Sequence, residues 1–172
     1  MNTIVDRLEK IKSKINSLKP SKQVNIIAVS KTFTYNHIKP LIDHGHLHFG
    51  ENKVQEASVK WSEHKKNSSN LKLHMIGKLQ SNKAKDAVKI FDYIHSLDNL
   101  KLAEKIALEQ DKKKFRPKIF IQVNIGKEIQ KNGIDIESLE KFYLNCEKNF
   151  NLNIVGLMCL PPHDNTPDVY FS

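Results

Sequence analysis

Hydrophobic residues follow two alternating patterns along this chain. Residues 4–18 place apolar side chains three and four positions apart, which predicts a helix with one buried face, and Pro20 ends it. From there on, short apolar runs alternate with segments of helical period. The runs predict strands at residues 26–30, 47–49, 73–76, 93–95, 118–124 and 154–158, and the segments between them predict five helices.

Polar residues mark where three of these helices begin. Asn36, Ser81 and Asp135 stand just before segments of helical period, so each is a predicted N-cap. Pro40 is expected in the first turn of its helix, where a missing backbone N–H costs least. Gly45 is the predicted end of the same helix.

Strands and helices that alternate at this spacing predict βαβ units and a parallel sheet. Two architectures satisfy the pattern, an open doubly wound sheet and a (β/α)8 barrel. The sequence has no GxGxxG or Walker pattern and only six glycines, which argues against the nucleotide-binding folds. A barrel needs eight strands, whereas residues 1–172 supply six strand units.

Composition indicates one soluble globular domain. The chain has 172 residues, of which 39% are hydrophobic and 27% charged. The first ten residues resemble no secretory signal, and no apolar run is long enough to span a membrane, so a cytoplasmic location is expected. The net charge of +9 comes almost entirely from lysine, since Arg7 and Arg116 are the only arginines. Because nucleic-acid readers depend on arginine, this charge suits a small acidic ligand better than a nucleic acid.

Lys31 is the main candidate for chemistry. It directly follows the first apolar run, and the working residues of parallel α/β proteins lie just past the carboxyl ends of their strands. Partial shielding from water at such a position would favour the neutral amine, which forms Schiff bases with aldehydes. The other strand ends carry amides, hydroxyls and lysines, with few paired carboxylates.

Five motifs occur in register along the chain. They are AVSKT at 28–32, FGENKVQE at 49–56, HMIGKLQSNK at 74–83, VNIGKE at 123–128 and GLMCLPP at 156–162. In order and spacing they resemble the pyridoxal phosphate homeostasis protein family, over essentially the whole chain after the first helix. One such motif would be weak evidence, but five in register make the resemblance specific.

The resemblance implies a barrel like the N-terminal domain of alanine racemase, with pyridoxal 5'-phosphate (PLP) held on Lys31 as an internal aldimine. It also implies that Asn52, His74, Asn124 and Met158 surround the mouth that holds the cofactor. Members of this family have no firmly established catalytic activity. The resemblance therefore implies a PLP carrier that serves vitamin B6 and amino-acid homeostasis, not an enzyme.

This sequence also departs from the family pattern. The family continues through a further helix and two strands that supply the phosphate cup, and those segments have no counterpart in residues 1–172. The resemblance therefore implies an incomplete barrel with about six of eight strand units, unpaired strand edges and weaker PLP affinity. A fragment, a truncated gene product without function and a part of a longer chain all fit this pattern.

Three other interpretations stay open. His44, His46 and His48 include an HxH pair of the kind that binds zinc, although hydrogen-bonded histidines around a turn have the same pattern. A PLP-dependent amino-acid racemase or decarboxylase would need a second acid or base, for which the sequence offers no clear candidate. Lysine-rich stretches at residues 83–89 and 112–114 form either an interaction surface or a solvated face.

Overall fold

The computed structural model describes residues 3–68, 70–126 and 132–161. Its helices are α1 (Ile4–Ser17), α2 (Tyr35–Asp43), α3 (Val54–Asn67), α4 (Ala84–Ile90), α5 (Leu100–Lys113) and α6 (Leu139–Lys148). Its strands are β1 (Ala28–Val29), β2 (His48–Glu51), β3 (Lys72–Met75), β4 (Tyr93–Leu97), β5 (Lys118–Val123) and β6 (Ile154–Cys159). Within the described ranges, none of the helices is both long and apolar enough to cross a membrane.

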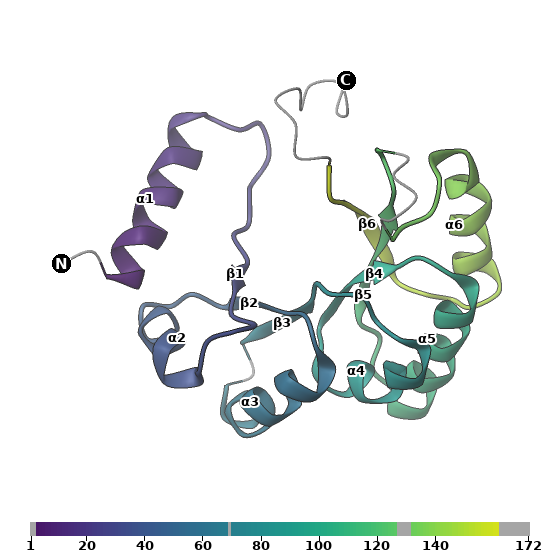
Figure 1. Ribbon diagram of the computed structural model, residues 1–172, viewed down its shortest axis with the longest axis horizontal. Coiled ribbons are helices and arrows are strands. Elements are labelled where there is room, and N and C mark those ends of the chain that lie inside the picture. Colours follow the sequence, from purple (N-terminus) through teal and green to yellow (C-terminus); the bar gives the residue numbers. More distant parts are fainter. Residues whose placement is uncertain (1–2, 69, 127–131, 162–172) are drawn as a thin grey trace.

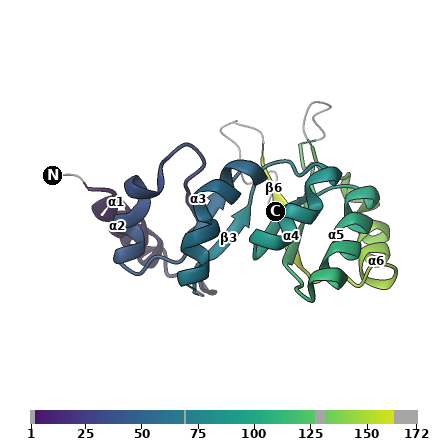
Figure 2. The ribbon, with the colours of Figure 1, turned by 90° about the horizontal axis from the view of Figure 1, so that it is seen from below.

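The strands form one parallel sheet in the order β1-β2-β3-β4-β5-β6. Every strand lies beside its neighbour in sequence, as right-handed βαβ crossovers require when a sheet curls toward a barrel. Helices cover the outer face of the curved sheet (Figures 1 and 2). In the described part of the chain, β1 and β6 are edge strands, so hydrogen bonds do not close the ring. The predicted class is thus confirmed as α/β with a barrel-like, incomplete sheet.

The outer face of the sheet packs against the helices and forms the apolar core. Side chains alternate between the two faces of a strand, so residues two apart share a face. Phe49 of β2, Leu73 and Met75 of β3, and Ile94 of β4 are almost fully buried under the helices. Trp61 of α3 is also fully buried, and its ring centroid lies 5.1 Å from that of Phe49.

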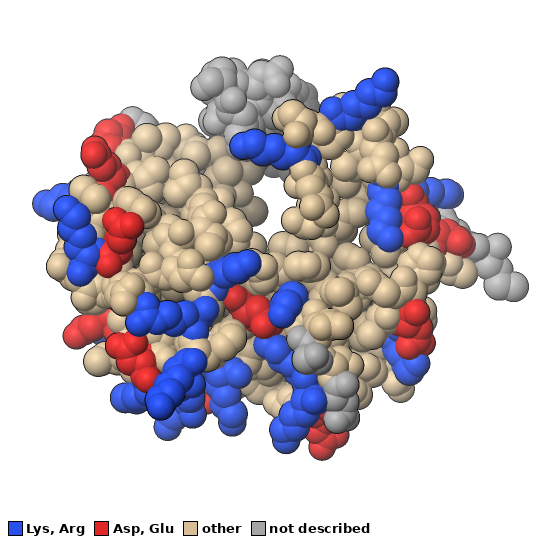
Figure 3. Space-filling model, turned by 180° about the vertical axis from the view of Figure 1, so that it is seen from behind, with Lys and Arg blue, Asp and Glu red and all other residues tan. Residues whose placement is uncertain are grey.

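The inner face of the sheet is unusually polar. It carries His48, His74, His95 and Gln122, whereas parallel strands are typically apolar on both faces. Seen from behind, the molecule has an opening near its centre (Figure 3). We refer to the space enclosed by the inner face as the lumen.

Helix starts are where sequence and structure differ. Thr34, not Asn36, is the N-cap of α2. Pro40 consequently lies inside the helix and not in its first turn; its ring is exposed, which avoids a clash with buried neighbours. Ser81 and Asp135 do not cap α-helices through their side chains, because each leads into a short 3-10 turn that precedes the α-helix.

Candidate functional site

Lys31 lies in a turn directly after β1, at the carboxyl end of the sheet. Its side chain is exposed, so the expected shielding from water is absent. Among the described residues, no hydrogen bond or ion pair involves its ammonium group, whereas Lys60 and Lys65 both have buried partners. Lys31 therefore offers an accessible amine at the strand end that the sequence predicts.

A buried carboxylate fixes the residue just before Lys31. The Glu51 side chain is fully buried, and its Oε1 accepts hydrogen bonds from the following three donors. They are Ser30 Oγ at 2.7 Å, Lys60 Nζ at 2.8 Å and Trp61 Nε1 at 2.9 Å. Lys60 also donates to the Ser30 carbonyl oxygen at 2.6 Å. The network ties the end of β1 to β2 and α3, and so holds the backbone from which Lys31 departs.

Sequence reasoning did not identify Glu51 or Lys60, although a signal was present. Glu51 shares its strand face with Phe49, a core residue, so its carboxylate must enter the helix layer. A buried carboxylate needs a cation and hydrogen-bond donors nearby, because removing a charge from water costs several kcal/mol in a protein even after the surroundings relax. Lys60 and Trp61 of α3 supply them at Glu51 Oε1, whereas the buried Glu51 Oε2 has no hydrogen-bond partner among the described residues.

Asn52 directly follows β2 and lies against Gly77, which lies just past the end of β3. Its backbone oxygen and Cα approach Gly77 so closely that a Cβ built on Gly77 would lie 2.8 Å from Asn52 Cα. A side chain at position 77 would therefore push Asn52 out of place. The close approach explains why the strand end after β3 requires glycine.

Substituting Gly77 by alanine is accordingly expected to reduce the free energy of unfolding by about 1–3 kcal/mol, because the added methyl group meets backbone that cannot yield freely. Urea unfolding followed by circular dichroism measures this change. An unchanged unfolding midpoint would show that the two strand ends are further apart than described.

Asn124 and Met158 lie on the last two strand units of the sheet, on the side away from β1. Gln122 pairs with Met158 in the register of β5 and β6, and Asn124 follows two residues later. The Asn124 N–H donates to the Ile134 carbonyl oxygen at 2.9 Å. Gly133, with a φ of +119°, permits this close return of the chain, since its Cβ would lie 2.8 Å from Asn124 N. The matched motif residues 127–131 lie outside the described residues.

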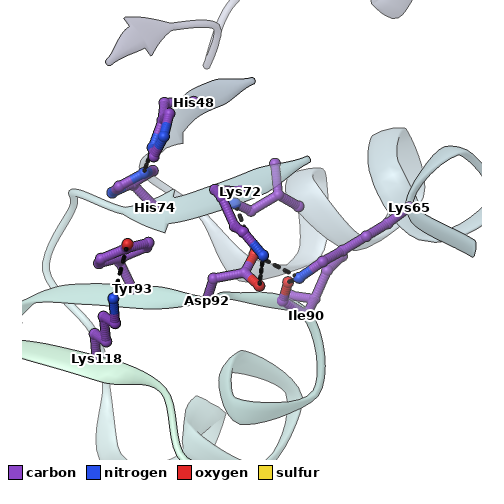
Figure 4. Close-up of polar contacts among 9 residues, drawn as sticks. His48, Lys65, Lys72, His74, Ile90, Asp92, Tyr93 and Lys118 are labelled. Atoms are coloured by element: carbon purple, nitrogen blue, oxygen red, sulfur yellow. Dashed lines mark hydrogen bonds and ion pairs between the residues drawn. The ribbon is translucent and has the colours of Figure 1, made fainter. Parts of the chain in front are cut away.

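His74 is placed differently from the other predicted site residues. It lies on the inner face of β3 with 3% of its surface exposed, and neighbouring imidazoles hold both of its ring nitrogens. His48 Nδ1 lies 2.9 Å from His74 Nε2, and His74 Nδ1 lies 2.9 Å from His95 Nε2. Figure 4 shows His48 and His74 pointing toward one another across neighbouring strands. We call His48, His74 and His95 the histidine ladder.

The surroundings of the ladder favour neutral imidazoles. Burial, and after it the neighbouring His95 and His48, lowers the pKa of His74 from 6.5 to about 3. Burial also lowers the pKa of His95 to about 4. Aromatic rings enclose the ladder, because Tyr93 stacks on His74 at 4.2 Å and Phe120 on His95 at 4.4 Å between centroids.

The candidate zinc triplet does not converge on one point. His44 Nε2 lies 3.0 Å from Glu9 Oε1, while His46 Nε2 lies 2.9 Å from the His48 carbonyl oxygen. His48 itself belongs to the ladder. Within residues 3–68, 70–126 and 132–161, no group of three or more His, Cys, Asp or Glu side chains is arranged to hold a metal ion.

Comparison with known proteins agrees with this architecture. The family described as "Alanine racemase, N-terminal domain" matches residues 4–171. The pyridoxal phosphate homeostasis protein of Buchnera aphidicola (subsp. Schizaphis graminum) is 39% identical over 166 residues, covering 94% of this chain and 72% of the relative. The Escherichia coli K12 protein of the same name is 31% identical and covers 94% and 71%. This chain belongs to the pyridoxal phosphate homeostasis protein family. The resemblance based on five motifs is thereby confirmed.

Solved structures support the same assignment. PipY of Synechococcus elongatus PCC7942, a COG0325 family member, is 36% identical with a TM-score of 0.76 without PLP, covering 88% of this chain and 71% of PipY. The PipY structure with PLP bound gives a TM-score of 0.75 over 90% of this chain and 72% of PipY. Alanine racemase of Clostridium difficile 630, at 16% identity and a TM-score of 0.68, covers 95% of this chain and 44% of the racemase and shares the fold.

Proposed function

We propose that this member of the pyridoxal phosphate homeostasis protein family binds PLP and holds its aldehyde as a Schiff base on Lys31. The supporting observation is the exposed amine of Lys31 at the carboxyl end of β1, which has no hydrogen-bond or ion-pair partner within the described residues and stands on a backbone that Glu51 and Ser30 fix. PipY, which is similar in sequence and fold, has a structure with PLP bound. Holding a reactive aldehyde reversibly would let the protein buffer PLP for vitamin B6 and amino-acid homeostasis.

The other four predicted site residues are given two different roles in this proposal. Asn52 lies at the strand end beside the one that carries Lys31, while Asn124 and Met158 lie at the ends of β5 and β6. We propose that these three side chains line the mouth around the cofactor. His74, whose ring nitrogens His48 and His95 engage, would support the floor of the site from the lumen.

We propose binding, not catalytic turnover, as the activity. The curated relatives are named as homeostasis proteins. Racemisation or decarboxylation needs an acid or base positioned beside the cofactor. In the described residues, two carboxylates around this strand end already have other partners, since Glu51 is buried in its network and Glu56 pairs with Lys53 at 2.7 Å.

Substituting Lys31 by alanine is expected to abolish the Schiff-base absorbance that appears when PLP is titrated into the protein, because the other ammonium group at that strand end, Lys60 Nζ, is held by Glu51 and the Ser30 carbonyl oxygen. Lys53→Ala is the matched control, since Lys53 is an exposed lysine at the start of α3. The control should titrate like the unmodified chain. Equal loss in both variants, or none in either, would overturn the assignment to Lys31.

A further inference from the structure

The amino-terminal end of the lumen holds a cluster that the proposed PLP site does not use. His48, Lys72, Tyr93 and Lys118 are the first residues of β2, β3, β4 and β5. In the sheet register His48 pairs with Lys72, and Tyr93 pairs with Lys118. Lys118 Nζ lies 3.5 Å from Tyr93 Oη (Figure 4). We call these four residues the amino-end cluster; Lys31 lies at the opposite end of the strands.

The cluster carries more positive than negative charge. Lys72 Nζ lies 4.0 Å from Asp92 Oδ1, but Asp92 Oδ2 already accepts from Lys65 Nζ at 2.7 Å and from the Leu73 N–H at 2.8 Å. In the described part of the chain, Lys118 has no carboxylate within ion-pair distance. Lys72 therefore has one carboxylate at 4.0 Å, which other donors already engage, and Lys118 has none among the described residues.

This excess of positive charge affects the protonation of His48. Burial, then Lys72, lowers the pKa of its imidazole, with Lys118 adding to the effect and Asp92 opposing it. A bound anion would offset the two ammonium groups and so favour an N–H, or a full positive charge, on His48. The titratable groups around His48 are the two lysines, Asp92, Tyr93, His46 and the remainder of the ladder.

The histidine ladder allows His48 to become a donor without any net change in charge. Each N···N contact needs one N–H and one lone pair, so the three neutral rings are aligned in one of two directions. In one direction His95 donates to His74 and His74 donates to His48, which leaves the His48 Nε2–H as a donor to a group outside the ladder. Reversing the direction turns the same nitrogen into an acceptor.

We propose that the amino-end cluster binds a phosphate group, with Lys72, Lys118, Tyr93 and His48 as donors and the ladder setting the tautomer of His48. Two ammonium groups, a phenol and an imidazole belong to the first residues of four neighbouring strands. That arrangement suits a tetrahedral oxyanion better than a planar carboxylate, which arginine forks recognise. This site lies at the opposite end of the strands from Lys31 and does not depend on PLP binding there, although His74 of the ladder is also proposed to support the PLP site.

Isothermal titration calorimetry with inorganic phosphate tests the site. We expect saturable binding at one site per chain, weakened about tenfold or more by Lys72→Gln and by Lys118→Gln, because each removes a charge-assisted contact. Lys112→Gln is the control, since Lys112 is an exposed lysine paired with Glu109 on α5. Lys31→Ala should leave phosphate binding unchanged, which separates this site from the PLP site.

The outcomes are distinct. Absence of saturable binding, equal weakening by Lys112→Gln, or acetate binding as tightly as phosphate would overturn the proposal. Glycerol phosphate as a second probe distinguishes a free phosphate site from one for phosphate esters, and binding of either supports the assignment. As an independent readout, 15N spectra of the histidines should show the His48 Nε2 becoming protonated when phosphate is added. Unchanged His48 signals at saturation would contradict the proposed role of the ladder.

Discussion

Replacing Glu51 by alanine is expected to reduce the free energy of unfolding by about 3–5 kcal/mol, the typical cost of removing one partner from a buried ion pair. The substitution leaves Lys60 Nζ, Trp61 Nε1 and Ser30 Oγ without the acceptor they share. The Trp61 indole and the Ser30 hydroxyl are buried, so water cannot easily replace the carboxylate. Urea unfolding monitored by Trp61 fluorescence measures the change.

Glu56→Ala provides the matched control for this experiment. Glu56 lies on the same helix as Lys60, but its pair with Lys53 is exposed, so its removal should change stability little. Glu51→Ala should also reduce the yield of PLP adduct on Lys31, because the Ser30 backbone is no longer tied to β2 and α3. A stability close to that of Glu56→Ala would contradict the anchoring role of Glu51.

Acidification from about pH 7 to about pH 5 is expected to destabilise the protein by about 2 kcal/mol or more through the histidine ladder. The pKa of His74 is about 3 and that of His95 about 4 in the folded chain, whereas both start from 6.5. Below pH 6.5 the unfolded chain therefore binds protons that the folded chain does not. The contribution of the ladder to stability is complete above pH 6.5 and is lost as the pH falls toward the folded pKa values.

The free energy of unfolding measured at several pH values tests this prediction. His74→Leu removes the central imidazole and should reduce the slope of stability against pH between about pH 7 and about pH 5. His44→Gln is the control, because His44 is an exposed residue beside Glu9, and its slope should match that of the unmodified chain. A slope that His74→Leu does not change would show that the ladder is not the source of the acid sensitivity.

Much of the fold was predictable because local pattern and global architecture agree. All six predicted strands are present, from the apolar run around Ala28 to that around Gly156, and their helices alternate with them as expected. The position of Lys31 was predictable for the same reason, since a residue that follows a strand of a parallel sheet emerges at its carboxyl end, whereas its role in the site stays a prediction. Helix starts were less predictable: Thr34 competes with Asn36 as a cap, and an exposed Pro40 is tolerated inside a short helix.

The side-chain networks depend on geometry that no single segment contains. His46 and His48 are close in sequence, and their spacing suggested a shared role. In the structure His48 instead joins His74 and His95, because the strands curl and bring their inner faces together. The amino-end cluster likewise depends on the register between four strands, which hydrophobic pattern alone does not fix.

Identification of the modified residue tests the central claim most directly. The purified chain is saturated with PLP, reduced with borohydride, digested and analysed by peptide mass spectrometry. We expect a single stoichiometric adduct on Lys31, although the chain contains many other exposed lysines. Adducts scattered over many lysines, or a dominant adduct on another lysine, would contradict the proposal that Lys31 holds PLP.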